Sequence, residues 1–91
     1  MSRREPNEQL AALLAEAEWS AGALARAVNV LGAARELELH YTRSSVAFWL
    51  NGSRPPAPVP EFVAQVLSRR TGRLLAPQDT GLAQLCDRTE T

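Results

Sequence analysis

The segment 42–56, TRSSVAFWLNGSRPP, constrains the fold of this chain more than any other. It opens with a threonine that suits a helix N-cap, and the apolar residues Val46, Trp49 and Leu50 follow at the spacing of one helical face. An Asn-Gly pair then ends the pattern, and the two prolines after it cannot continue a helix. The segment therefore predicts a short helix over residues 43–50 with one buried face, followed by a stiff loop.

Three more helices are expected, each with a recognisable start or end. Asn7 suits the N-cap of the first helix and Ser20 that of the second. Pro60 suits the first position of a further helix with Gly72 as its C′ residue, and residues 77–79 can begin one more helical turn. The sequence thus predicts an all-α fold, a compact bundle of four to five helices. The residues expected to face its core from these helices are Leu10, Leu13, Leu14, Ala17, Leu24, Val28, Leu31, Phe62, Val63, Val66 and Leu67.

The connection between the second and third helices is unusually long. The second helix is predicted to reach Ala34 or Arg35, although Gly32 within it costs about 1 kcal/mol relative to alanine. Residues 36–41 then alternate polar and apolar side chains, which indicates a short extended connection rather than part of a sheet. The apolar residues expected to hold it against the bundle are Leu37, Leu39 and Tyr41.

The chain has 91 residues, which is enough for one small domain, expected over residues 7–82. Residues 1–6 are expected to form a flexible arm, and residues 83–91 a tail or the start of a linker. No apolar run approaches the roughly 20 residues that span a bilayer. The N-terminal residues also lack the apolar stretch of a signal peptide. We therefore expect no membrane partner and a cytoplasmic location.

The sequence offers no set of residues that would assemble a catalytic or metal site. Cys86 is the only cysteine and His40 the only histidine, so neither an internal disulfide nor a cysteine-based zinc site can form. The acidic residues are scattered without a convergent pair, and no Gly-rich phosphate loop is present. We therefore expect no catalytic residues, no metal and no cofactor, and do not predict an enzyme.

Positive charge is concentrated on and after the predicted helix 43–50, although the formal net charge of the chain is zero. Residues 42–73 carry five arginines and one glutamate, a net charge of +4, whereas residues 1–41 and residues 74–91 each carry a net charge of −2. A neutral protein with one basic face can still dock on phosphates, with a modest dependence on salt.

The second and third predicted helices have the form of a helix-turn-helix, in which the second member is short and lies in the DNA major groove. The face of helix 43–50 opposite its apolar stripe carries Arg43, Ser44, Ala47 and Phe48, the predicted base-contacting residues. Arginine can bond the O6 and N7 atoms of guanine in bidentate fashion, and phenylalanine can pack on a thymine methyl group. If the helix were rotated instead, Phe48 would belong to the core.

Short polar side chains around the two helices are candidates for phosphate contacts, which set the register of a protein on DNA without reading its sequence. The start of the second helix is a natural phosphate site as well as a cap. The predicted phosphate-contacting residues are Ser20, Thr42, Ser45, Asn51, Ser53 and Arg54. Three further arginines, Arg69, Arg70 and Arg73, either extend this track or complement the C-terminus of their helix.

Two segments carry a resemblance to a known family. Residues 20–28, SAGALARAV, resemble the first helix of the phage-repressor-like (lambda-repressor-like), xenobiotic-response-element-type helix-turn-helix domains. Residues 42–52, TRSSVAFWLNG, resemble their recognition helix. The similarity covers residues 7–82 and is closest in kind to small regulators of Streptomyces-like actinobacteria. The family turn usually has three or four residues, whereas residues 29–41 separate the two segments in this chain.

This resemblance implies a sequence-specific double-stranded DNA-binding protein that regulates transcription at the nucleoid. It also implies a homodimer, because such regulators commonly bind two half-sites one turn apart. Two alternatives stay open. The fold can serve as a protein-interaction module, an antitoxin or accessory subunit, with Phe48 as a contact for a protein partner. The chain can also be the N-terminal part of a longer regulator.

Overall fold

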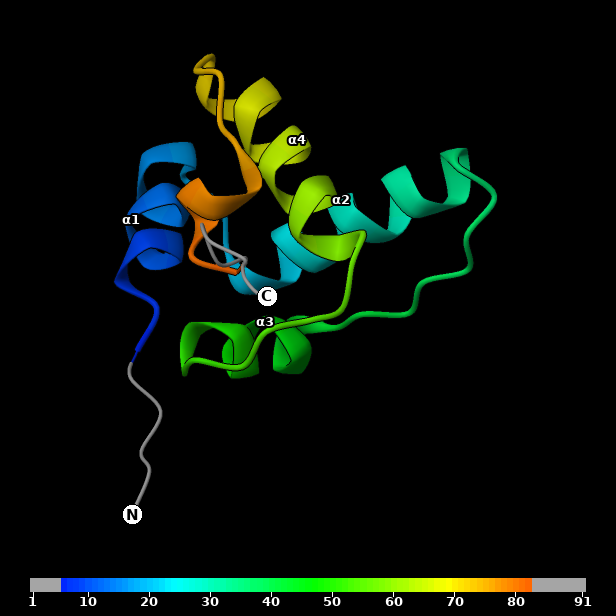
Figure 1. The fold of residues 1–91 in the computed structure, drawn as a ribbon, viewed down its shortest axis with the longest axis horizontal. Coiled ribbons are helices and arrows are strands. Elements are labelled where there is room, and N and C mark those ends of the chain that lie inside the picture. The colour runs from blue at the N-terminus through cyan, green and yellow to red at the C-terminus, as the bar shows by residue number, and fades with distance from the viewer. Residues whose placement is uncertain (1–5, 83–91) are drawn as a thin grey trace, which may run out of the picture.

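Helix α2 packs on α3 along one side and on α4 along another (Figure 1). Helix α1 contacts α4 and α3, and the short 3-10 helix η1 packs on α4 and α1. The computed structural model describes residues 6–82. The helices are α1 (Glu8–Ala17), α2 (Ala21–Ala34), α3 (Arg43–Leu50), α4 (Val59–Thr71) and η1 (Pro77–Thr80). The predicted all-α bundle is confirmed.

Two of the three predicted N-caps, Asn7 and Ser20, are confirmed by side-chain hydrogen bonds. Asn7 Oδ1 accepts a bond of 3.0 Å from the N–H of Leu10, and Ser20 Oγ accepts one of 3.1 Å from the N–H of Ala23. These bonds satisfy amide groups that have no partner within the helix. The start of both helices is therefore fixed by a single polar side chain in each case.

The core is formed by the residues that the helical spacing predicted. All eleven residues expected to face inward from the flanking helices are buried, together with Val46 and Trp49 of α3. Leu50 is half-buried and packs against this core, as do Leu39 and Tyr41 of the connector. Leu37 does not, since its side chain is exposed, and the prediction that it would hold the connector down was wrong.

The long connector between α2 and α3 is held by specific contacts with α2. The side-chain amide of Asn29 donates to the carbonyl oxygen of Tyr41 at 2.8 Å, and its oxygen accepts from the N–H of Tyr41 at 2.9 Å. A Cβ atom on Gly32 would overlap the side chain of Leu39. This glycine therefore lets the connector approach α2 closely, which explains its place inside a helix.

The ends of α4 largely follow the prediction. Gly72 terminates the helix with a φ of +78°, as expected of a C′ glycine. Pro60 occupies the second helical position rather than the first, because α4 begins at Val59. Beyond the C-terminal end of α4, the Leu74 side chain is 98% exposed, whereas Leu75 packs on the core.

Asn7 ties together three elements that are far apart in the sequence. Its N–H donates to the carbonyl oxygen of Leu50 at 2.7 Å, at the end of α3. Its side-chain amide donates to the carbonyl oxygen of Thr80 at 2.9 Å, at the end of η1. The next residue in that turn, Gly81, has no room for a Cβ atom beside the Asn7 side chain. The cap of α1 thus also fixes the position of α3.

A pair of glycine substitutions tests this tie. Gly72 and Gly81 have nearly the same left-handed backbone, with φ of +78° and +75°, but a Cβ atom meets nothing within 4 Å at Gly72 and meets Asn7 at Gly81. We expect Gly72→Ala to lower the free energy of unfolding by about 1 kcal/mol, the cost of the backbone conformation. Gly81→Ala should cost about 2 kcal/mol, because it also disturbs hydrogen bonds of Asn7. Urea denaturation measures the free energy of unfolding of both variants. Equal losses would contradict a stabilising role for the hydrogen bonds of Asn7.

Candidate nucleic-acid interface

Helix α3 turns one face to the core and leaves the other open. Val46 and Trp49 are buried, and the Trp49 and Tyr41 rings pack in a T-shaped arrangement with centroids 5.2 Å apart. The four predicted base-contacting residues, Arg43, Ser44, Ala47 and Phe48, are all exposed. The Phe48 side chain is 61% exposed, so the helix is not rotated to bury it. An apolar ring on this open face is poorly placed unless something covers it.

The starts of α2 and α3 lie next to each other. A Cβ atom built on Gly22, in the first turn of α2, lies 3.8 Å from the Cβ atom of Arg43. At the start of α3, the N–H of Thr42 donates to Ser45 Oγ at 3.3 Å. Two helix N-termini, each carrying partial positive charge, are thereby brought to one edge of the exposed face of α3.

A tight turn shapes the other end of α3. The N–H of Asn51 donates to the carbonyl oxygens of Ala47 and Phe48, and the N–H of Ser53 donates to that of Phe48 at 2.9 Å. Gly52 between them has a φ of +108°, a conformation that favours glycine. The turn directs the chain away from the helix and leads to Arg54, which is exposed.

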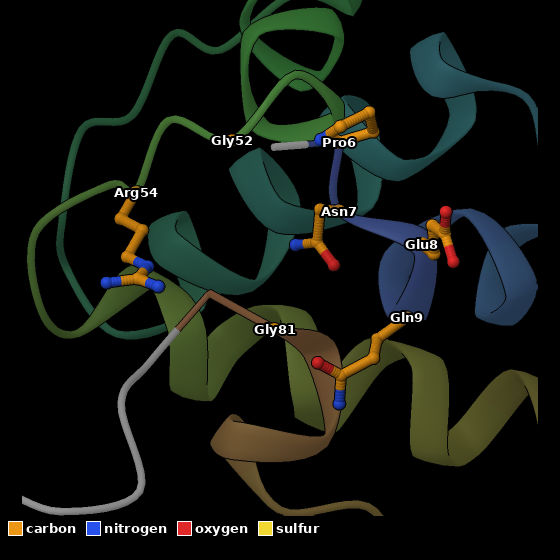
Figure 2. Close-up of a pocket in the computed structure, with 7 residues that line it drawn as sticks. All are labelled: Pro6, Asn7, Glu8, Gln9, Gly52, Arg54 and Gly81. Carbon is orange, nitrogen blue, oxygen red and sulfur yellow. The ribbon is translucent and has the colours of Figure 1, made fainter. Parts of the chain in front are cut away.

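Arg54 borders a hollow of about 830 Å³ beside this end of α3. Figure 2 shows Arg54 from the α3–α4 loop on one side and Asn7, Glu8 and Gln9 from the start of α1 on the other. Glu8 brings a negative charge to the hollow, which does not suit a phosphate inside it. In Figure 2 the Arg54 side chain extends away from Gly52 at the end of α3, and because it is exposed it can turn to meet a phosphate beside that helix.

The arginines at the end of α4 do not continue a phosphate track. Arg73 forms two hydrogen bonds with the Glu16 carboxylate, at 2.7 and 2.8 Å. Arg70 Nε donates to the carbonyl oxygen of Ala17 at 2.8 Å, and its guanidinium lies 5.8 Å from the ring centroid of Trp19. This end of α4 also lies far from α3 in Figure 1. The arginines of the positively charged segment 42–73 therefore lie on two separate surfaces. Only Arg43 and Arg54 belong to the surface around α3.

Residues 6–82 contain neither a membrane-spanning helix nor a cluster of metal ligands. No helix of this part of the chain is long and apolar enough to cross a membrane. The same residues contain no group of three or more His, Cys, Asp or Glu side chains placed to hold a metal ion. His40 is exposed on the connector, whereas Cys86, the rest of the predicted tail 83–91 and residues 1–5 of the predicted arm lie outside the described residues.

Comparison with known proteins gives one family. No curated protein and no solved structure matches the sequence. The family described as the SP15 N-terminal domain matches residues 10–83, a range that begins at the first buried leucine of α1 and includes α2, α3, α4 and η1. Because the match covers most of the chain, this protein belongs to the family of SP15 N-terminal domains.

Proposed function

We propose that this domain binds double-stranded DNA in a sequence-specific manner and regulates transcription, with α3 in the major groove. The observation that carries the proposal is the construction of α3. Val46 and Trp49 fix one face in the core, while the opposite face presents Arg43 and Phe48 to solvent. A short helix held rigidly on one side, with an arginine in its first turn, fits the role of a recognition helix.

The exposed side chains of α3 divide into two kinds of base contact. Arg43 lies at the start of the helix, where it can bond a guanine through O6 and N7. Phe48 lies one turn further, next to Ala47, and this pair offers an apolar surface for thymine methyl groups. Ser44 adds a hydroxyl that can donate or accept a hydrogen bond with either kind of base.

The phosphate candidates gather at the two ends of α3, as a protein lying across a groove requires. Ser20 and Thr42 cap neighbouring helix starts at one end. Asn51, Ser53 and Arg54 follow the tight turn at the other end. Ser45 is half-buried and bonded to Thr42, so its contribution is to shape the helix start as well as to contact DNA.

Arg54→Ala should weaken binding to every duplex by a similar factor, because a phosphate contact carries no sequence information. The plot of log affinity against log salt should become shallower by about 0.9 for each phosphate that the variant no longer neutralises. Arg69→Ala is the matched control, since Arg69 is also exposed but lies at the far end of α4. Fluorescence anisotropy over a range of salt concentrations measures both. Loss of binding to one sequence alone would contradict the phosphate role.

The proposal is tested most directly by mapping the surface that DNA covers. In a titration of the isotope-labelled protein with duplex DNA, amide signals of α3, of the start of α2 and of residues 51–54 should shift together. The amides at the C-terminal end of α4 should stay in place. Shifts spread evenly over the molecule, or centred elsewhere, would contradict a groove-reading α3.

Homodimerisation belongs to the same proposal, because one small domain covers few base pairs and regulators of this type occupy paired half-sites. Leu74 is an exposed apolar side chain that such an interface could cover. Sedimentation of the protein alone and on DNA measures the stoichiometry. A single copy in both states would remove this part of the proposal and leave DNA binding intact.

The exposure of Phe48 also favours a second candidate, a protein-interaction module in which α3 meets a protein. Aromatic side chains and arginines dominate binding energy at protein interfaces, and α3 exposes one of each. The two candidates differ in one result. Arg43→Ala should reduce discrimination at one base pair of a specific duplex if α3 reads DNA, whereas a protein-binding α3 would show no specific duplex to begin with.

A further inference from the structure

A second surface, unrelated to α3, is hollowed between α2 and α4. The groove has a volume of about 370 Å³ and is lined mainly by apolar side chains. Val30 is 64% exposed there, an unusual position for a valine in a helix that is otherwise well packed. Single exposed apolar residues are common on protein surfaces, but an apolar side chain that lines a groove is a candidate contact for a partner.

The groove lies on the side of α2 away from α3. In helical geometry, Ala27, Val30 and Ala34 share one side of α2, and Gly22 and Asn29, which meet α3 and the connector, lie on another. A molecule bound in the groove would therefore not cover the exposed face of α3. The two surfaces can be occupied at the same time.

The shape of the groove suits a helix. Its α2 wall runs from Ala27 to Ala34, about two helical turns, with Val30 and Leu31 between two alanines. The small side chains at both ends let a partner backbone approach closely, and apolar side chains of the partner can pack on Val30 and Trp19. This is the geometry in which grooves between helices receive amphipathic segments.

The charged residues that line the groove are both arginines, Arg69 and Arg70. The bond from Arg70 Nε to Ala17 holds its guanidinium over Trp19, at the edge of the apolar surface. Within the described residues, the only ion pair is that of Arg73 with Glu16. A second copy docking symmetrically would bring the same arginines together, because a two-fold interface pairs identical patches. The charge favours an acidic occupant instead.

We propose that this groove binds an amphipathic helix of a partner protein, with apolar side chains on Val30 and Trp19 and carboxylates facing Arg69 and Arg70. The proposal does not depend on DNA binding by α3. It assigns a separate protein contact to the domain, and it fits the use of such a domain either as a regulator or as an accessory subunit.

The two tryptophans of the chain make a direct test possible, because Trp19 lines the groove and Trp49 is buried under α3. The probe is a synthetic helical peptide with leucines on one face and glutamates on the other, added to the full isotope-labelled chain. The indole N–H signal of Trp19 should shift and that of Trp49 should not. A peptide with lysine in place of every glutamate should bind more weakly by about tenfold or more.

Val30→Glu should abolish the shift of Trp19, because a carboxylate in the apolar surface repels the peptide. Leu37→Glu is the matched control, since Leu37 is also an exposed apolar residue but does not line the groove. Equal binding of the two peptides, or unchanged binding by Val30→Glu, would overturn the proposal. A Trp19 signal that moves with protein concentration alone would also overturn it, in favour of a second copy. Duplex DNA should leave the Trp19 indole unmoved, so failure of peptide binding is separate from failure of DNA binding.

Discussion

Replacing Trp49 by alanine is expected to lower the free energy of unfolding by about 3–5 kcal/mol. Its side chain is only 4% exposed, packs with Val46 in the core and meets the Tyr41 ring edge to face. Removal would leave a cavity under α3 and also release the connector. Because small domains have a total stability of about 5–15 kcal/mol, the loss is a large part of the whole. Urea denaturation followed by circular dichroism measures it.

Phe48→Ala is the matched control, because it removes an aromatic ring from the neighbouring position on the opposite face of the same helix. We expect its stability to stay within about 0.5 kcal/mol of the wild type, as for other surface positions. Its affinity for a recognised DNA sequence should nevertheless fall, since the ring is available only for intermolecular contact. Equal destabilisation by the two substitutions would contradict an α3 that buries Trp49 and exposes Phe48.

Arg43→Ala is expected to remove about 1–3 kcal/mol of discrimination at one base pair, which is roughly 5- to 150-fold in affinity. The reason is geometric, since a guanidinium can bond two acceptors of one guanine and alanine can bond neither. The measurement compares wild-type and variant protein on the recognised duplex and on a duplex in which that guanine is changed. The wild type should distinguish the two duplexes, and the variant should not.

The pattern of loss decides what Arg43 does. A uniform loss on both duplexes would make it a phosphate contact, the role proposed for Arg54. No loss on either duplex would remove it from the interface. Stability should not change in any of these cases, because Arg43 is exposed, and a folded variant can be confirmed from its unfolding transition.

The helices could be predicted because the residues that cap a helix, and the apolar residues that define its buried face, lie close together in the sequence. Asn7 and Ser20 each cap within three residues, and Val46 and Trp49 define a face within one turn. The exposed face of α3 follows from the same spacing, so the candidate base-contacting residues could be chosen without a structure.

The arrangement of the helices could not be predicted, because it depends on partners far apart in the sequence. Nothing near Asn29 indicates its two hydrogen bonds with Tyr41, although a polar residue within an apolar helix is a weak signal. Gly32 was expected only to weaken α2, but it admits Leu39. Arg73 was a phosphate candidate by proximity in sequence, and its actual partner, Glu16, lies in α1.

The most direct test of DNA recognition is the sequencing of genomic DNA fragments captured by the purified full chain at physiological salt, where non-specific binding is weak. We expect enrichment of one sequence motif, and an inverted repeat within the motif if the protein binds as a dimer. A variant with both Arg43 and Phe48 replaced by alanine should capture no such motif. No enrichment by well-folded wild-type protein would contradict the account and assign α3 to a protein partner instead.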